Sequence, residues 1–372
     1  MLSDLRCIDI RKLSEMFDPE SRETYVSLYL NLVRGDGHFV ERRRKACRSV
    51  LGGDRALVEN LDRTMEKVER RLDPSEREKG QRGLVIFASR AHGLLEVHKL
   101  AVPVDDLMVV SASPYIRPLA ALREEHVAYG LVVLDSHRAR IYVVSSGLFE
   151  DEECIAEDIM KRHKKGGMSQ ARFQRLRTGA VEHFLKEVSE AMACEFARNE
   201  VSRIVIAGPG TAKTMLKEIL PKELGCKVLG LLDMEFDEAE SCLALRAGEE
   251  VREDERRTVS GNLERLRAGV LTHGLAVHGH AETAEALRRG QVELLLVCRD
   301  LRLRGWICER CQLFEPGTVQ RCPSCGGRVS EIDTVEELVE LAERKDTEVE
   351  FVDDSELLGE LGGVAGILRY AG

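Results

Sequence analysis

The sequence predicts an α/β protein with more than one domain, and three observations carry this prediction. The chain has 372 residues, which exceeds the size at which one hydrophobic core usually keeps growing. Strand-like runs at 201–208 and 226–234 flank a helical pattern at 211–220, which is typical of a β-α-β unit with parallel strands. A buried strand-like run at 292–298 lies between helical patterns at 281–290 and 334–345, which indicates another α/β layer.

Residues 1–125 form the first predicted domain, which has an α/β composition of its own. Its strand-like runs cover 24–33, 82–89, 93–100 and 106–112. Charged helical patterns cover 39–51 and 54–72, and Pro103 and Pro114 punctuate the end of the region.

Residues 126–238 form the second predicted domain. It opens on "GLVVLDSHRARIYVV" (130–144), whose two β-branched runs predict a hairpin around "DSHR". A long helical pattern runs from 171 to 199 before the β-α-β unit. The segment "GPGTAK" (208–213) follows a strand but lacks the spacing of a phosphate-binding loop. We therefore expect a tight strand-to-helix turn there.

Residues 239–372 form the third predicted domain, an α/β/α sandwich that follows a charged helical pattern at 237–269. A cysteine-rich insert interrupts it at about 304–330. Two Cys-x-x-Cys pairs separated by ten residues supply four thiols on two tight turns, as tetrahedral zinc requires. The pattern predicts a structural zinc ribbon, the alternative being redox or merely buried thiol pairs. The predicted ligands of Zn²⁺ are Cys308, Cys311, Cys322 and Cys325.

The composition predicts a soluble cytoplasmic protein. No apolar run approaches the ~20 residues that a membrane span needs, and the N-terminus lacks the pattern of a signal peptide. The other seven cysteines are scattered, and we expect reduced, mostly buried thiols. With a net charge of -10, the chain is not a general nucleic-acid coat.

One basic run stands out in this acidic chain: "KRHKKGGMSQARFQRLR", residues 161–177. Gly166 and Gly167 have no side chains, so the backbone there can enter a narrow space and adopt positive φ. A basic stem with a side-chain-free tip suits insertion into a phosphate-lined RNA cavity, although a mobile basic loop is the alternative. The predicted RNA-binding residues are Lys161, Arg162, His163, Lys164, Lys165, Arg172, Arg175 and Arg177.

This run resembles the Gly-Gly-Gln loop of the archaeal and eukaryotic class-1 peptide chain release factors. The segments "GLVVLDSHRARIYVV" (130–144), "ETAEALRRGQVELLLV" (282–297) and "LGGVAGILRY" (361–370) are similar to other parts of that superfamily. The resemblance covers roughly residues 125–372. It implies a three-domain architecture whose middle domain reaches the ribosomal peptidyl-transferase centre and whose third domain can contact a translational GTPase.

Two departures from the release-factor pattern distinguish between the functions that the resemblance implies. Met168 occupies the position where termination factors have Gln, and Gln170 stands two residues later. This Gly-Gly-x-x-Gln spacing looks like that of the Vms-like and bacterial or archaeal release-factor-like rescue proteins. The stop-codon-reading strings Asn-Ile-Lys-Ser and Tyr-x-Cys-x-x-x-Phe do not occur in residues 1–125. The resemblance therefore implies peptidyl-tRNA hydrolysis in ribosome rescue, with stop-codon termination and a non-catalytic ribosome-binding module as alternatives.

The resemblance also implies roles for particular residues and partners. The catalytic segment comprises Gly166, Gly167, Met168, Ser169 and Gln170, in which Gln170 or a backbone amide near Met168 orients the attacking water. The implied partners are large-subunit ribosomal RNA and peptidyl-tRNA, with a GTPase as a further candidate and no membrane.

Overall fold

The structure is a computed structural model that describes residues 5, 8–18, 20, 23–34, 37–73, 75, 77–145, 148–156, 170–308 and 310–370. Of residues 148, 150–154, 156 and 170–178 it describes the backbone alone. The chain forms two compact units. One contains residues 1–125, here the N-terminal region, together with 259–372, the C-terminal region, and the other contains residues 126–258, the middle unit.

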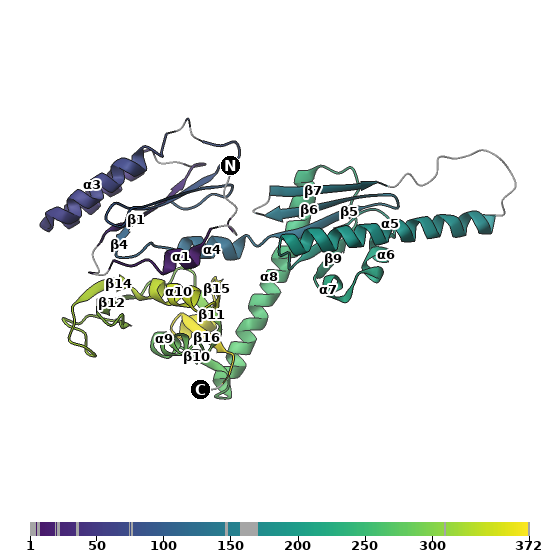
Figure 1. Cartoon of the computed structure of the whole chain (residues 1–372). Helices are drawn as coiled ribbons and strands as arrows, with labels where there is room; N and C mark the ends of the chain where they lie inside the picture. The colour runs from purple at the N-terminus through teal and green to yellow at the C-terminus, as the bar shows by residue number, and fades with distance from the viewer. Residues whose placement is uncertain are drawn as a thin grey trace. The chain divides into compact units, whose positions relative to one another are not determined.

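The N-terminal region is built on a four-stranded antiparallel sheet. Its strands are β1 (Tyr25–Asn31), β2 (Gly83–Ser89), β3 (Leu94–Leu100) and β4 (Leu107–Ser111), in the order β3-β2-β1-β4. Helix α3 (Arg55–Glu69) covers one face, to which α2 (Phe39–Val50) adds Phe39 and Val40, while α1 (Ile10–Ser14) and α4 (Arg117–Glu125) cover the other (Figure 1). Alternate β2 residues supply the two cores, with Val85 and Phe87 on the α1 and α4 side and Leu84 and Ile86 on the α3 side.

The middle unit is a mixed five-stranded sheet in the order β7-β6-β5-β8-β9. Strands β5 (Tyr129–Leu134), β6 (Arg138–Ser145) and β7 (Leu148–Ala156) form an antiparallel meander, whereas β8 (Ile204–Ala207) and β9 (Val228–Leu232) run parallel to β5. Helices α5 (Gln170–Arg198), α6 (Ala212–Ile219) and α7 (Lys222–Gly225) pack on one face. The first half of α8 (Glu240–Leu271) packs on the other.

The C-terminal region contains the predicted α/β/α sandwich. Its sheet has the order β10-β16-β11-β15, from β10 (Ala276–His278), β11 (Val292–Cys298), β15 (Glu348–Val352) and β16 (Val364–Leu368). Leu295 and Val297 pack toward α9 (His280–Arg288) and α10 (Thr334–Arg344), and Leu294 and Leu296 pack toward the second half of α8 and α11 (Glu356–Glu360). This alternation along one buried strand is what places helices on both faces.

Two sequence expectations about burial were wrong. Cys194 and Cys226 are exposed rather than buried, and Cys47, Cys242 and Cys298 are half-buried. The segment "HGLAVHGHAE" (273–282) predicts a turn with solvated imidazoles and not a metal site, but His280 is buried and packs edge-on against Phe314, with ring centroids 5.7 Å apart. Helical periodicity could not reveal this, because the aromatic partner comes from the inserted ribbon.

None of the helices in the described ranges is both long enough and apolar enough to cross a membrane.

Candidate functional site

The four cysteines predicted as metal ligands come together in the C-terminal region. Strands β12 (Arg304–Cys308), β13 (Phe314–Pro316) and β14 (Val329–Asp333) form an antiparallel sheet in the order β13-β12-β14, which carries the two turns. The Sγ atoms of Cys308, Cys311, Cys322 and Cys325 all lie within 4.8 Å of one another. The Sγ atoms are 3.4 Å apart for Cys308 and Cys325, and 3.6 Å apart for Cys311 and Cys322.

This donor set fits a tetrahedral thiolate-bound metal. Zn–S bonds of about 2.3 Å imply sulfur separations of roughly 3.8 Å in a tetrahedron, close to the separations between these thiols. Burial raises the pKa of the Cys308 thiol, but the backbone N–H groups of Cys311 and Arg310 donate to its Sγ and lower the pKa to about 6. A thiol that ionises this readily is prepared to act as a metal ligand.

The second cysteine turn requires glycine at two successive positions. Gly326 has φ +70°, in the left-handed region that side chains disfavour. At Gly327 an added Cβ would lie 3.2 Å from the Sγ atoms of both Cys308 and Cys325. The two glycines after the last Cys-x-x-Cys pair therefore permit the turn and the close approach of its backbone to the sulfurs.

The predicted catalytic and RNA-binding segment joins β7 to α5 in the middle unit. Residues 161–169 lie outside the described residues, so the structure does not place Gly166, Gly167, Met168 or Ser169, nor the basic residues 161–165. Gln170 is the first residue of α5, and Arg172, Arg175 and Arg177 follow in its first turns, where only the backbone is described. The structure thus brings the end of this segment to a helix N-terminus, where the first backbone N–H groups have no intrahelical acceptor.

Helix α5 is anchored firmly to the sheet along its remaining length. Phe184, Val188, Met192 and Phe196 are buried against the sheet. A Cβ on Gly130 of β5 would approach the Phe196 ring to 2.5 Å, so this strand position accommodates the ring because it lacks a side chain. The helix that begins at Gln170 therefore rests on a rigid support.

The turn at 208–213 has the expected form of a strand-to-helix connection. Lys213 is buried, and its Nζ donates to the carbonyl oxygens of Gly208 and Gly210, at 2.8 Å each, and contacts the Asp233 carboxylate. A lysine whose donors are used by its own turn is not available to hold phosphate. This geometry supports the sequence prediction that the segment is not a phosphate-binding loop.

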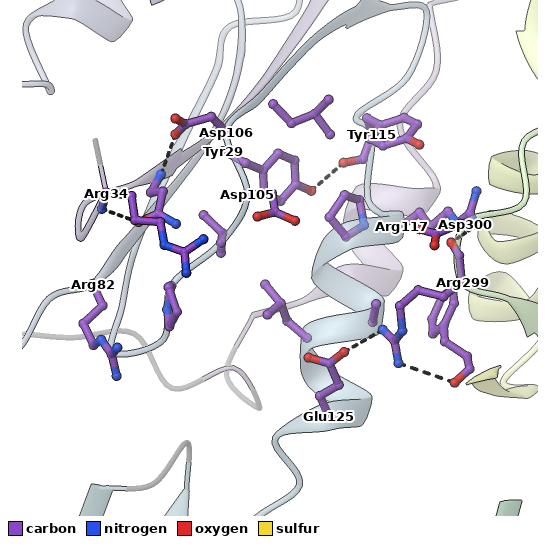
Figure 2. Close-up of a pocket in the computed structure, with 18 of the residues that line it drawn as sticks. Tyr29, Arg34, Arg82, Asp105, Asp106, Tyr115, Arg117, Glu125, Arg299 and Asp300 are labelled. Carbon is purple, nitrogen blue, oxygen red and sulfur yellow. Dashed lines mark hydrogen bonds and ion pairs between the residues drawn. The ribbon is translucent and has the colours of Figure 1, made fainter. Parts of the chain in front are cut away.

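A cleft of about 720 Å³ lies in the unit formed by the N-terminal and C-terminal regions (Figure 2). Pro103, Pro118 and Phe351 supply apolar walls, and exposed arginines such as Arg34 and Arg82 are mixed with exposed carboxylates such as Asp105. The lining therefore mixes apolar walls with solvated groups of both charge signs and does not point to one class of ligand.

Sequence reasoning missed the charged residues that join the two regions of this unit, Arg117, Glu336 and Glu340, all of which are buried. One signal was available: Glu336, Glu340 and Glu343 recur at i, i+4 and i+7 and form a single acidic stripe on α10. In the sequence alone such a stripe indicates a solvated helix face. The structure shows that residues of the N-terminal region cover this face of α10.

Comparison with known proteins identifies the family. Residues 114–256 match the family described as Bacterial archaeo-eukaryotic release factor family 10, and residues 254–371 match eRF1 domain 3. The peptide chain release factor subunit 1 of Archaeoglobus fulgidus is 31% identical over 280 residues, which cover 69% of each chain. That of Methanococcoides burtonii is 30% identical over 288 residues, which cover 70% of each chain.

Solved structures of similar proteins include the archaeal translation termination factor aRF1, with 18% identity, 97% of this chain and 96% of that chain covered, and a TM-score of 0.27. They also include the translation termination-like factor Dom34 of S. cerevisiae, with 14% identity, 77% and 79% coverage, and a TM-score of 0.45. The sequence relationships cover two thirds or more of both chains at 30% identity or above. This chain therefore belongs to the archaeal and eukaryotic class-1 peptide chain release factor superfamily.

Proposed function

We propose that this protein releases nascent peptides from stalled ribosomes by promoting hydrolysis of peptidyl-tRNA. One observation carries the proposal: a member of the release factor superfamily has Gly-Gly-Met-Ser immediately before a helix that begins at Gln170. Membership of the family supports this class of reaction, and the place of the segment before α5 supports its role as the tip presented to the ester.

The reaction is the attack of water on the ester that joins the peptide to the terminal ribose of tRNA. The water oxygen bonds to the acyl carbon, the bond from that carbon to the ribose oxygen breaks, and the ribose oxygen gains a proton. Gln170 orients the water through its amide, which has no useful pKa and is not a general base. Backbone N–H groups near residues 167–169 stabilise the developing oxyanion. The tRNA 2′-OH and the ribosome handle the protons.

The basic residues hold the tip in place. Lys164, Lys165, Arg172 and Arg175 bind phosphates of the large-subunit RNA, and Gly166 and Gly167 allow close approach to the ester. Catalysis then depends mainly on positioning, so free esters are not substrates. A translational GTPase that binds the C-terminal region is a candidate delivery partner.

Rescue is preferred to termination because the two stop-codon-reading strings are absent from residues 1–125 and Gln170 is displaced from the position that termination factors use. Stop-codon-dependent termination remains the second candidate, since the relatives at 30% and 31% identity are named peptide chain release factor subunit 1.

The test uses ribosomes loaded with labelled peptidyl-tRNA and with a stop codon, a sense codon or no codon in the A site. We expect the wild-type protein to release peptide irrespective of a stop codon. Gln170→Ala, which removes a transition-state contact, and Gly167→Ala, whose methyl group hinders close approach to the ester, should each lower the release rate at least about 100-fold while ribosome association is retained. Gln174→Ala, which removes the same side chain one turn along α5, is the matched control and should retain wild-type activity.

The outcomes separate the candidates. Release confined to the stop-codon complex would establish termination instead of rescue. Binding without release from any complex would leave only the ribosome-binding module. Wild-type release by Gln170→Ala would remove the role assigned to its side chain.

We further propose that the four-cysteine cluster holds Zn²⁺ in a structural role. Four protein ligands leave no open coordination position for substrate, so the metal would stabilise the three-stranded ribbon and would not take part in hydrolysis.

A further inference from the structure

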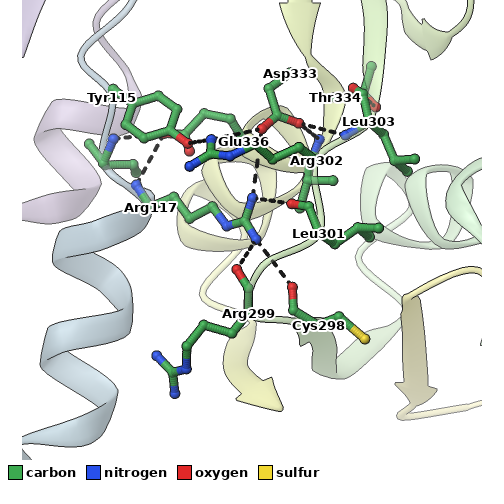
Figure 3. Close-up of polar contacts among 12 residues, drawn as sticks. Tyr115, Arg117, Cys298, Arg299, Leu301, Arg302, Leu303, Asp333, Thr334 and Glu336 are labelled. Atoms are coloured by element: carbon green, nitrogen blue, oxygen red, sulfur yellow. Dashed lines mark hydrogen bonds and ion pairs between the residues drawn. The ribbon is translucent and has the colours of Figure 1, made fainter. Parts of the chain in front are cut away.

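The N-terminal and C-terminal regions meet around α4, the last helix before the middle unit. Residues from both regions exchange polar contacts across this boundary (Figure 3). The contacts run in both directions: the N-terminal region inserts a guanidinium group into the C-terminal region, and the C-terminal region supplies a carboxyl group to the N-terminal region.

The guanidinium belongs to Arg117, the first residue of α4, which is 5% exposed. It donates hydrogen bonds to three carbonyl oxygens of the C-terminal region, those of Cys298, Arg299 and Leu301. These carbonyls lie at the last residue of β11 and just beyond it, where the chain leaves the sheet; that of Cys298 also accepts the backbone N–H of Leu301. One buried guanidinium of the N-terminal region therefore binds three carbonyl oxygens at this end of β11.

The carboxyl group belongs to Glu336 of α10, which is also 5% exposed. Its Oε1 accepts the backbone N–H of Ile116 at 2.7 Å and that of Arg117 at 3.1 Å. These N–H groups lie at the N-terminus of α4 and have no acceptor within the helix. Glu336 thus caps a helix of the N-terminal region from the other side of the boundary.

Further contacts extend the boundary along α4 and α10. Ser113 Oγ donates to Glu340 Oε1 at 3.0 Å, and Arg123 pairs with Glu343. Arg299 Nη1 lies 2.6 Å from Glu125 Oε1 at the last residue of α4. Both ends of this helix are therefore held by the C-terminal region.

Two chain segments lead to the middle unit: α4 on one side and α8 on the other. The C-terminal region also holds α8. In the part of α8 that belongs to this unit, Leu266 is fully buried among residues of β11 and β16. Asn262 donates to Glu350 at 2.9 Å. The C-terminal region therefore anchors both chain segments that lead to residues 126–258.

We propose that Arg117 and Glu336 form an interdomain lock that makes residues 1–125 and 259–372 a single rigid and cooperative body. Removal of the Arg117 or the Glu336 side chain leaves buried hydrogen-bonding groups without partners. This lowers the free energy of unfolding far more than the loss of an exposed ion pair does. The N-terminal region then cannot move independently of the C-terminal region.

The test measures hydrogen–deuterium exchange of the full-length protein across a urea series. In the wild type, we expect β2 of the N-terminal region and β11 of the C-terminal region to lose protection in one transition. Glu336→Ala should accelerate exchange in residues 116–125 at least about tenfold, as expected when two buried backbone N–H groups lose their acceptor, and should make β2 exchange at lower urea than β11. Glu331→Ala, an exposed glutamate on neighbouring β14, is the matched control and should change neither.

Two further variants test the same contacts if Glu336→Ala does not fold. Glu336→Gln keeps an acceptor oxygen and the shape of the side chain, so it should preserve the coincident transition, whereas Arg117→Ala should separate the two strands as Glu336→Ala does. Separate transitions for β2 and β11 in the wild type would overturn the lock directly. Unchanged exchange in residues 116–125 of folded Glu336→Ala would do the same.

Discussion

At the scale of single residues, the turn after β8 has a position that requires glycine because another part of the backbone lies too close for any side chain. Gly208 has φ +151°, and a Cβ there would lie 1.9 Å from the carbonyl oxygen of Leu134. Gly210 has φ +68°, but a Cβ there would meet nothing within 4 Å. Glycine is therefore required at position 208 by a steric contact as well as by φ, and at position 210 by φ alone.

We expect Gly208→Ala to lower the free energy of unfolding by at least about 3 kcal/mol, because strain in φ and an overlap with backbone both apply. Gly210→Ala, which has only the left-handed backbone, should cost about 1 kcal/mol. Urea denaturation followed by far-UV circular dichroism measures both. Equal costs for the two variants would show that the contact with Leu134 does not constrain the turn.

At the scale of elements, α10 carries a buried acidic stripe that makes stability depend on pH. Burial raises the pKa of Glu336 to about 8, although the N–H groups of Ile116 and Arg117 oppose the shift. Burial also raises the pKa of Glu337 to about 7, and that of Glu340 well above its ordinary value, with repulsion from the other two glutamates adding to the effect. These carboxyl groups bind protons more tightly in the folded chain than in the unfolded one.

The sign of the pH effect follows from this difference. Below pH 4.5, the ordinary carboxyl pKa, both states are protonated and the full stabilisation is present. As the pH rises from there to about 8, the unfolded chain loses protons that the folded chain retains, so stability falls. We expect the urea midpoint to be lower at pH 8 than at pH 6 and Glu336→Gln to flatten this dependence, with Glu331→Gln as the exposed control. A midpoint that rises over this interval would contradict the assignment.

Elements with strong periodicity were predicted correctly from the sequence. The expected helix at 171–199 is α5 (Gln170–Arg198), and the expected hairpin at 130–144 is β5 and β6. Local pattern was sufficient because each element buries one continuous stripe or alternates along one strand. Helix α4 was not predicted, since it is buried between the N-terminal sheet and α10, which lies more than 200 residues later in the chain.

At the scale of the whole molecule, the proposed metal site lies beside a single fluorescent side chain that can report on it. Trp306, the only tryptophan of the chain, is 3% exposed and packs with Cys308 and Cys322. A structural metal whose ligands span two turns contributes folding free energy to the segment that it closes.

Removal of the metal by a chelator under reducing conditions should therefore shift Trp306 emission to longer wavelength and increase exchange of residues 304–333. The middle unit, which contains none of the four ligands, should keep its protection. Cys311→Ser should have the same effect as chelation, whereas Cys226→Ser, which changes an exposed cysteine of the middle unit, should not. Wild-type emission after chelation, or purified protein with no bound metal, would exclude the structural zinc.

The sequence by itself determined the α/β class, the grouping of the four cysteines and the membership suggested by the run at 161–177, because each depends on residues close together in the chain. Only the tertiary structure decided that residues 1–125 and 259–372 form one compact unit and that Arg117 and Glu336 satisfy each other's regions. Burial of a charge is set by what covers it, and here the covering residues lie on the far side of the middle unit in the sequence.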